Sequence, residues 1–473
     1  MTSDNGVASK RHAVILSGGG ANGAYEIGVM KALFGGHVKL GEDPTEGPVK
    51  IDPMVFTGTS VGSFNAAFMA SRPGQAAATT LNELEELWRN RIAGTKTRWN
   101  GVFRLRGNVL ELTDLNRLLV NPLTPPANFL KDAAFFAKDS ISRAELFFRS
   151  KVEVMRRLVE LVDFSTLIST EPLQDLVRET IKIEQIRTNK ECALVIAATN
   201  WEKGETEVFT NPKAAVRTKY KVLDEKIGHL AILASAAIPG IFPTVEIYHT
   251  KYIDGGLLMN TPLSPAIHAG ADVLHVIYLD PDLKDVPIDS AGGSLDMLNR
   301  LSTLAFAGQV NRDVKQARSI NQVLDLHRQM AGVLKTTFGR DRIESLGLGS
   351  AADKIDKITE EALDEITRKQ ETYECTYGKQ HRLRPITIHR YHPGSLLEGG
   401  VFGMLNFDSS RVSDLIHQGF EDAAEHNCIK CECIFPTIDK LHEVAVRTCI
   451  RKKDDEALGT ALTSPVAEPT DSP

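Results

Sequence analysis

The sequence predicts an α/β protein whose mainly parallel sheet is sandwiched by helices. A short apolar strand over residues 11–17 leads through a glycine-rich loop into a helix expected at about residues 22–34. A second strand, over 54–57, leads through a sharp turn into a helix of small residues over 61–70. This alternation favours parallel pairing, because each helix carries the chain back to the end where the next strand starts.

The later chain continues this pattern and then returns to the sheet. Further strands are expected over residues 193–198, up to 253, over 273–279 and, as PITIHRY, over 385–391. Helices are expected over 223–237, before the helix-breaking Pro239, and over 408–426, where the pattern is amphipathic.

These elements divide the chain into five parts. In order, we expect an α/β core over 11–290 with a helical insertion at about 81–190, a helical segment over 291–382, a late strand and helix completing the core over 383–427, a Cys-containing segment over 428–455, and a tail over 456–473. The tail is polar and Pro-rich, which predicts disorder.

Composition excludes several classes of protein. The net charge of -6 argues against a nucleic-acid binder, which usually carries a basic domain. The apolar run at residues 13–16 is too short for a signal peptide, and no stretch approaches the ~20 apolar residues of a membrane span. Six cysteines are too few for a disulfide scaffold. We therefore expect a cytoplasmic protein.

The second strand–turn–helix unit contains a candidate nucleophile. Gly58-Thr59-Ser60-Val61-Gly62 has the form G-x-S-x-G and lies between strand and helix, as a nucleophile elbow requires. A side chain at Gly58 or Gly62 would collide with neighbouring backbone in so tight a turn. The alternative interpretation is an ordinary Gly/Ser turn.

The first unit contains a loop suited to binding negative charge. The backbone N–H groups of Gly18-Gly19-Gly20-Ala21-Asn22-Gly23 can converge on one point, as an oxyanion requires. The same residues match the G-x-G-x-x-G dinucleotide fingerprint, which also needs an acid ending the second strand. Here Glu42 and Asp43 lie in a Gly/Pro loop, so support for that alternative is poor.

A third motif, Asp254-Gly255-Gly256, follows directly after a predicted strand. An aspartate there can point over the C-terminal edge of the sheet, where ligands of α/β proteins bind. The alternative is a simple turn, because Asp-Gly is a common turn dipeptide.

Together the three motifs resemble the patatin-like phospholipases. The resemblance rests on GGGANG between strand and helix, then GTSVG, then DGG with Asn260 and Pro262 beyond it. SAAIPGIF at 235–242, PITIHRY and GFEDA at 419–423 also look like pieces of that family, so the resemblance covers about residues 11–425.

The resemblance implies a lipid acyl hydrolase with a Ser–Asp dyad and no histidine. Ser60 would attack the ester carbonyl of a phospholipid or acylglycerol, and Asp254 would take its proton. The N–H groups of Gly18, Gly19 and Gly20 would hold the oxyanion, and water would then hydrolyse the acyl-enzyme. No metal or organic cofactor is implied.

One residue departs from the family pattern, and two other functions stay open. The family often has Arg or Lys where this chain has Asn22, which puts a headgroup-binding charge at that position in doubt. The open alternatives are a nucleotide-binding oxidoreductase that uses the Gly18–Gly23 loop and a catalytically inactive lipid-binding module.

The stretch 88–108 contains basic residues and no acid. Its cations are Arg89, Arg91, Lys96, Arg98, Arg104 and Arg106, and Trp88, Trp99 and Phe103 lie among them. Such a mixture suits an anionic lipid surface, so we hypothesise peripheral association with membranes. Trp88 also continues the helical spacing of Leu84 and Leu87, which favours a place in the core.

Cysteines near the C-terminus suggest a second hypothesis. Cys428, Cys431 and Cys433, with His426 and His442 nearby, invite a zinc site, but their spacing is irregular and only one such group exists. Reduced thiols are the favoured interpretation, and His389, His392 and His268 are interpreted as structural.

Overall fold

The computed structural model describes residues 10–40, 48–94, 100–105, 168–211, 221–223, 227–279, 385–394, 397 and 403–436, with scattered positions between 314 and 381. Within these ranges no helix is long and apolar enough to cross a membrane. The expected tail over 456–473 and most of the segments 106–167 and 291–382 lie outside the described residues.

A nine-stranded sheet forms the centre of the molecule, with β13-β10-β1-β2-β5-β6-β7 as its main order. The strands are β1 (His12–Leu16), β2 (Val55–Thr59), β5 (Ala193–Asn200), β6 (Glu205–Thr210), β7 (Lys221–Val222), β8 (Val245–Ile247), β9 (Thr250–Asp254), β10 (Val273–Ile277) and β13 (Thr387–Tyr391). The five strands from β13 to β5 are parallel. β9 pairs antiparallel with β5 and with β8. The predicted mainly parallel sheet is therefore confirmed.

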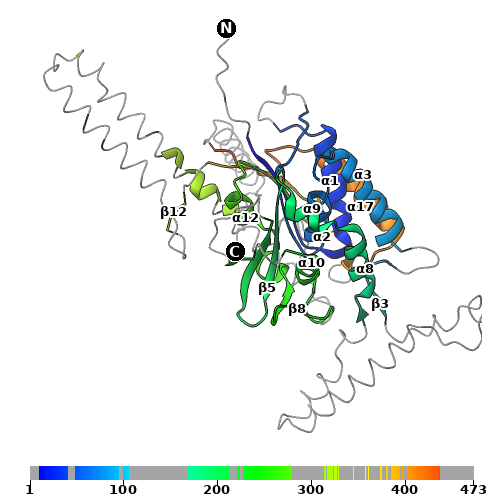
Figure 1. The fold of residues 1–473 in the computed structure, drawn as a ribbon. Coiled ribbons are helices and arrows are strands. Elements are labelled where there is room, and N and C mark those ends of the chain that lie inside the picture. The colour runs from blue at the N-terminus through cyan, green and yellow to red at the C-terminus, as the bar shows by residue number, and fades with distance from the viewer. Residues whose placement is uncertain are drawn as a thin grey trace, which may run out of the picture.

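Helices cover both faces of this sheet. They are α1 (Gly23–Gly35), α2 (Val61–Ala70), α3 (Ala77–Leu87), α8 (Glu171–Thr180), α9 (Ile183–Thr188), α10 (His229–Ser235), α11 (Gly256–Met259), α12 (Leu263–His268) and α17 (Ser409–Ala424). Figure 1 shows α1, α3 and α17 together on one side and α12 on the other.

Burial along β1 shows why both faces need cover. Val14 and Leu16 belong to the apolar core under α1, α2 and α17, whereas Ala13 and Ile15 belong to a second core under α12. All four are fully buried. A strand buried on both faces is the situation that parallel α/β sheets create, and it explains the continuous apolar run in the sequence.

Two predicted boundaries are wrong. The helix expected over 223–237 is only α10, because Lys221 and Val222 form β7 beside β6 and Leu223 follows that strand. In the segment expected to be helical, β11 (Tyr373–Glu374) pairs with β12 (Gln380–His381). Tyrosines and a threonine around one glycine favour such a hairpin, a local preference that the helical interpretation overlooked.

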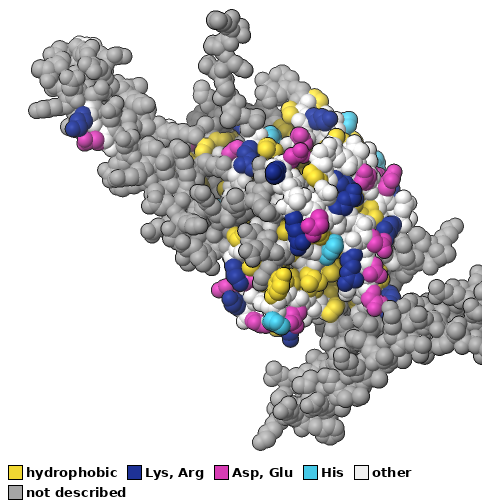
Figure 2. Space-filling model, in the orientation of Figure 1, with side chains coloured by type: hydrophobic (Ala, Val, Ile, Leu, Met, Phe, Trp, Pro, Cys, Tyr) yellow, Lys and Arg dark blue, Asp and Glu magenta, His cyan; other side chains and the backbone are white. Residues whose placement is uncertain are grey.

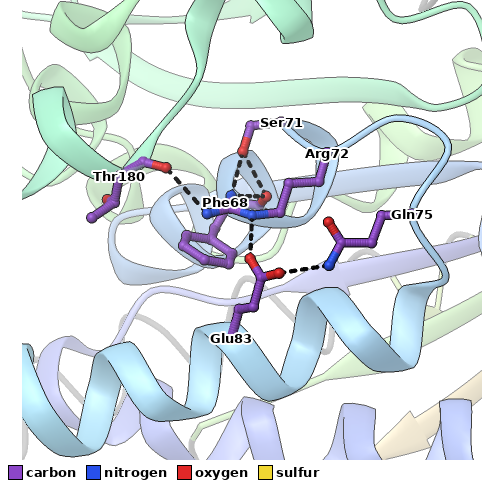
Figure 3. Close-up of polar contacts among 6 residues, drawn as sticks. All are labelled: Phe68, Ser71, Arg72, Gln75, Glu83 and Thr180. Atoms are coloured by element: carbon purple, nitrogen blue, oxygen red, sulfur yellow. Dashed lines mark hydrogen bonds and ion pairs between the residues drawn. The ribbon is translucent and has the colours of Figure 1, made fainter.

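The far end of α2 is anchored by Arg72 (Figure 3). Its guanidinium donates to the carbonyl of Phe68 at 3.1 Å and lies 3.5 Å from that residue's ring centre. It also pairs with Glu83 of α3 at 2.8 Å, and Gln75 holds the other oxygen of that carboxylate. A cation at a helix C-terminus satisfies free carbonyls, so this cluster fixes the helix that directly follows Ser60.

Candidate active site

The G-x-S-x-G segment forms a strained turn between β2 and α2. Ser60 has φ of 55° and ψ of -125°, a backbone conformation that residues other than glycine rarely adopt. A Cβ atom at Gly58 would lie 2.2 Å from the carbonyl oxygen of Gly62, and one at Gly62 would lie 2.5 Å from that of Leu16. The two glycines are thus a steric requirement of the turn, which raises the Ser60 hydroxyl off the sheet.

Ser60 and Asp254 meet at one edge of the sheet. Thr59 is in register with Ala197 across β2 and β5, and Ala198 is in register with Asp254 across β5 and β9. The Ser60 hydroxyl donates to Oδ2 of Asp254 at 2.6 Å. The two motifs are therefore brought together by strand pairing, although they are far apart in the sequence.

The carboxyl group of Asp254 is buried and held in place by hydrogen bonds. Its Oδ1 atom accepts a hydrogen bond from the backbone N–H of Gly256 at 2.7 Å, which orients the carboxyl group. Burial raises the pKa of Asp254 to about 6, against the lowering effect of the hydrogen bonds from Ser60 and Gly256. A carboxylate with a raised pKa accepts a proton more readily at neutral pH. Among the described residues no histidine is hydrogen bonded to either member of the pair.

Ser235 is a residue of the site that the sequence did not single out. Its hydroxyl accepts the N–H of Ser60 at 2.9 Å and donates to the carbonyl of Ala197 at 2.6 Å. It therefore ties the turn at Ser60 to β5. The signal lay in the SAAIPGIF segment before Asp254, which identified the family but not the task of its serine.

The glycine-rich loop lies against this pair. A Cβ atom at Gly18 would be 3.0 Å from the Cβ of Ser60, and one at Gly23 would be 2.4 Å from Val61. In this structure the N–H of Gly18 donates to Asn260, at 3.1 Å to Oδ1 and 3.2 Å to the carbonyl oxygen, so its part in holding an oxyanion stays a prediction.

The amides of Gly19 and Gly20 differ from that of Gly18. Neither has a hydrogen-bond acceptor within the part of the chain that the structure describes. Gly20 also borders the apolar pocket beside Ser60. The loop thus leaves two donors for a bound group.

An apolar pocket opens beside Ser60. It contains about 570 Å³ of space between atoms, a figure that includes open solvent at its mouth, and its lining is almost wholly apolar. Its walls include residues from five places in the sequence: Phe64 of α2, Trp88 and Ile92, Leu173 and Leu176 of α8, the segment from Ile232 to Phe242, and the segment from Met404 to Phe407. Such a cavity suits a hydrocarbon chain, and it draws on more than the 81–190 insertion.

The family comparison agrees with this geometry. A model of the patatin-like phospholipase family, a family of lipid acyl hydrolases, matches residues 14–267. The chain belongs to this family. No curated protein matches it. The matched residues include the glycine loop, the nucleophile turn and Asp254, which confirms the resemblance stated from the sequence.

Membership in the patatin-like family disfavours the dinucleotide interpretation, and the structure gives a physical reason. A dinucleotide site needs an acid where the second strand ends. In this patatin-like domain β2 ends at Thr59, followed by the strained Ser60. Glu42 and Asp43 lie outside the described residues.

Asn22 itself carries no charge, but a positively charged side chain lies beside it. Arg411, from the first turn of α17, donates to Oδ1 of Asn22 at 2.8 Å. Because Asn22 directly precedes α1 at the end of the glycine loop, this patatin-like site has a guanidinium beside the loop. No sequence motif indicates this contact, because α17 comes almost 400 residues after Asn22.

The three cations of the basic stretch that the structure describes are each paired with an acid from outside the stretch. Arg89 pairs with Glu85, Arg91 with Glu179, and Arg104 with Glu171. On the face shown in Figure 2, Lys and Arg side chains are likewise interspersed with Asp and Glu.

Trp88 belongs to the core of the domain, as its helical spacing predicted. It is 1% exposed, and its indole N–H donates to Asn65 at 2.9 Å. Phe103 is buried as well. Lys96, Arg98, Trp99 and Arg106 lie outside the described residues.

Proposed function

We propose that the protein hydrolyses carboxylic ester bonds of lipids, as a phospholipase of the A type, with Ser60 as nucleophile and Asp254 as general base. The observation that carries this proposal is the 2.6 Å hydrogen bond from the strained Ser60 hydroxyl to the buried carboxylate. The adjoining apolar pocket supports a lipid acyl chain as the group that is bound.

In the first half of the reaction Ser60 Oγ attacks the ester carbonyl carbon while its proton passes to Oδ2 of Asp254. The carbonyl oxygen becomes an oxyanion, and the amides of Gly19 and Gly20 donate to it. When the intermediate collapses, the bond to the leaving alcohol breaks and Asp254 returns the proton to the alcohol oxygen. The product is an acyl-enzyme.

In the second half water replaces the alcohol. Asp254 takes a proton from the water as its oxygen attacks the acyl carbon, and the same amides hold the second oxyanion. Collapse releases the fatty acid and returns the proton to Ser60. Every proton is carried by Asp254, so the proposed cycle needs neither histidine nor a metal ion.

The substrate class is tested by incubating the purified protein with a panel of glycerophospholipids and acylglycerols and analysing the products by mass spectrometry. Wild type should release free fatty acid from at least one lipid, and Ser60→Ala should release none. Ser71→Ala is the matched control, because Ser71 is a buried serine at the other end of α2. Binding without turnover by wild type would show an inactive lipid-binding module instead.

Peripheral membrane association is part of the proposal, and Lys96, Arg98 and Arg106 are the cations of the basic stretch that lie outside the described residues. Reversing Lys96 and Arg98 to Glu should weaken co-sedimentation with anionic liposomes and leave turnover of a water-soluble ester unchanged, because neither residue belongs to the dyad. Unchanged sedimentation would exclude a membrane role for these residues.

A further inference from the structure

Four side chains that carry metal-binding atoms converge where the C-terminal segment meets the sheet, outside the residues that match the family. This His/Cys cluster consists of His389, His426, Cys428 and Cys433. Their ligand atoms all lie within 4.8 Å of one another. All four residues are less than a tenth exposed.

The distances inside the cluster are those of a tetrahedral metal site. Cys428 Sγ lies 3.6 Å from Nδ1 of His389 and 3.4 Å from Nε2 of His426, and Cys433 Sγ lies 3.5 Å from the same Nε2. With zinc–sulfur bonds of ~2.3 Å and zinc–nitrogen bonds of ~2.0 Å, a tetrahedral ion holds its sulfur and nitrogen ligands about 3.5 Å apart. The three measured separations match this edge length.

The backbone holds the two cysteines in this arrangement. Between them the chain makes a tight turn, in which the N–H of Cys433 donates to the carbonyl of Cys428 at 2.9 Å. Asn427 Oδ1 accepts the N–H groups of Ile429 and Lys430, each at 3.0 Å. The spacing Cys428-x4-Cys433 lies within the two to four intervening residues usual for zinc-binding cysteine pairs.

The two histidines come from separate elements that the turn joins. His389 lies in β13, and His426 follows the end of α17. Ile434, directly after Cys433, exchanges two backbone hydrogen bonds with Ile388, at 2.8 and 2.9 Å. This antiparallel bridge places Cys433 next to the strand that carries His389.

Polar groups around the cluster fit bound metal better than free side chains. The Nδ1 atom of His426 is buried without a hydrogen-bond partner among the described residues, and its Nε2 faces thiol sulfurs. Thiols are weak partners for Nε2, and a metal bound to Nε2 would replace them there, while Nδ1 would keep its ring proton. The backbone N–H of Arg390 donates to Cys433 Sγ at 3.4 Å, the kind of outer contact that supports a metal-bound thiolate.

We propose that the His/Cys cluster is a structural zinc site. Two sulfur and two imidazole ligands in tetrahedral array select zinc among the common metals, and four protein ligands leave no open position for a substrate. The ion would fasten the end of α17 and the segment 427–434 to the edge strand β13. Because α17 packs on α1, the helix that follows the glycine loop, the site would stabilise the core from outside it.

The test is metal analysis of the full chain purified under reducing conditions without chelator. Wild type should contain about one zinc per chain, and cobalt added to the apoprotein should give the absorption of a tetrahedral thiolate complex. Cys428→Ser and Cys433→Ser should each lose most of the zinc. The control Cys192→Ser, directly before β5, should keep it. Cys431→Ser should keep most of it, because Cys431 contacts His426 from within the same turn but is not one of the four proposed ligands.

The cobalt spectrum of wild type keeps the proposal testable even where a cysteine variant fails to fold. An octahedral spectrum or a zinc-free wild type would overturn the proposal. A disulfide between Cys428 and Cys433 that persists in protein purified under reducing conditions would also overturn it. Zinc loss in Cys431→Ser equal to that in Cys428→Ser would overturn the ligand set.

Discussion

The active site and the His/Cys cluster are both assembled from distant segments, but their residues are fixed in different ways. Ser60 sits in a turn that only flanking glycines permit, and Asp254 is followed by two glycines. His389 lies in the middle of an ordinary strand, and His426 follows an ordinary helix. Positions set by backbone sterics are visible in the sequence, whereas positions set by tertiary contacts are not.

The largest expected effect is that of Asp254→Asn on catalysis. Asparagine keeps the shape of the side chain but cannot accept the hydroxyl proton, so kcat on a water-soluble ester should fall by about 10²–10⁴-fold. Steady-state kinetics and a circular dichroism spectrum on the same sample provide the check. A mild loss, together with a histidine variant that proves severe, would mean that the proton acceptor has been misidentified.

The same substitution should stabilise the fold at high pH. A folded pKa of about 6 against 3.8 for the free group means that the folded state binds the proton more tightly, so burial of the charge costs stability above pH 6. The difference between these two pKa values corresponds to about 3 kcal/mol of folding stability lost at high pH. Asp254→Asn should therefore melt above wild type at pH 8, and this advantage should shrink as pH falls from 6 towards 4. An advantage independent of pH would contradict the buried carboxylate.

A smaller loss is expected for Ser235→Ala. Removing this hydroxyl leaves the N–H of Ser60 buried without its acceptor, which costs about 1–3 kcal/mol, or roughly 5- to 150-fold if it appears in kcat/KM. Ser71→Ala should leave kcat/KM unchanged, because its hydroxyl bonds only at the far end of α2. Equal losses in the two variants would show a general packing effect rather than support of the nucleophile.

The smallest expected effect is that of metal removal on turnover. If the cluster binds zinc, chelation should lower the melting temperature, because a ligand of the folded state stabilises it. The initial rate at low temperature should change little, since the proposed cycle uses no ion. Calorimetry and an ester assay on the same chelated sample separate the two regions. A rate that falls in proportion to zinc loss would place metal in the chemistry.

Much of the fold was predictable because its signals are local. The apolar runs of β1 and β10 and the small-residue helix after Ser60 appear in the sequence as they do in the structure. β7 was not predicted because it has only two residues, too few to show the alternation typical of a strand, and the apolar run that follows them favours a helix. Its place depends on pairing with β6, which only the tertiary structure supplies.

The candidate site shows the same limit at the level of single atoms. The sequence correctly located the three motifs, but it could not show that Asn260 occupies the amide of Gly18. Nor could it show that Arg411 reaches Asn22 or that Met404 and Phe407 line the pocket. The two hydrogen bonds join residues more than 200 positions apart, and the pocket walls come from separate elements.

The pairing of Ser60 with Asp254 is tested most directly by labelling with a fluorophosphonate. Wild type should take up one phosphonate per chain, on the peptide that contains Ser60, and the labelling rate should rise with pH through an apparent pKa of about 6 as Asp254 loses its proton. Asp254→Asn should be labelled far more slowly. An adduct on another serine, or a wild-type labelling rate kept by Asp254→Asn, would contradict the Ser–Asp dyad.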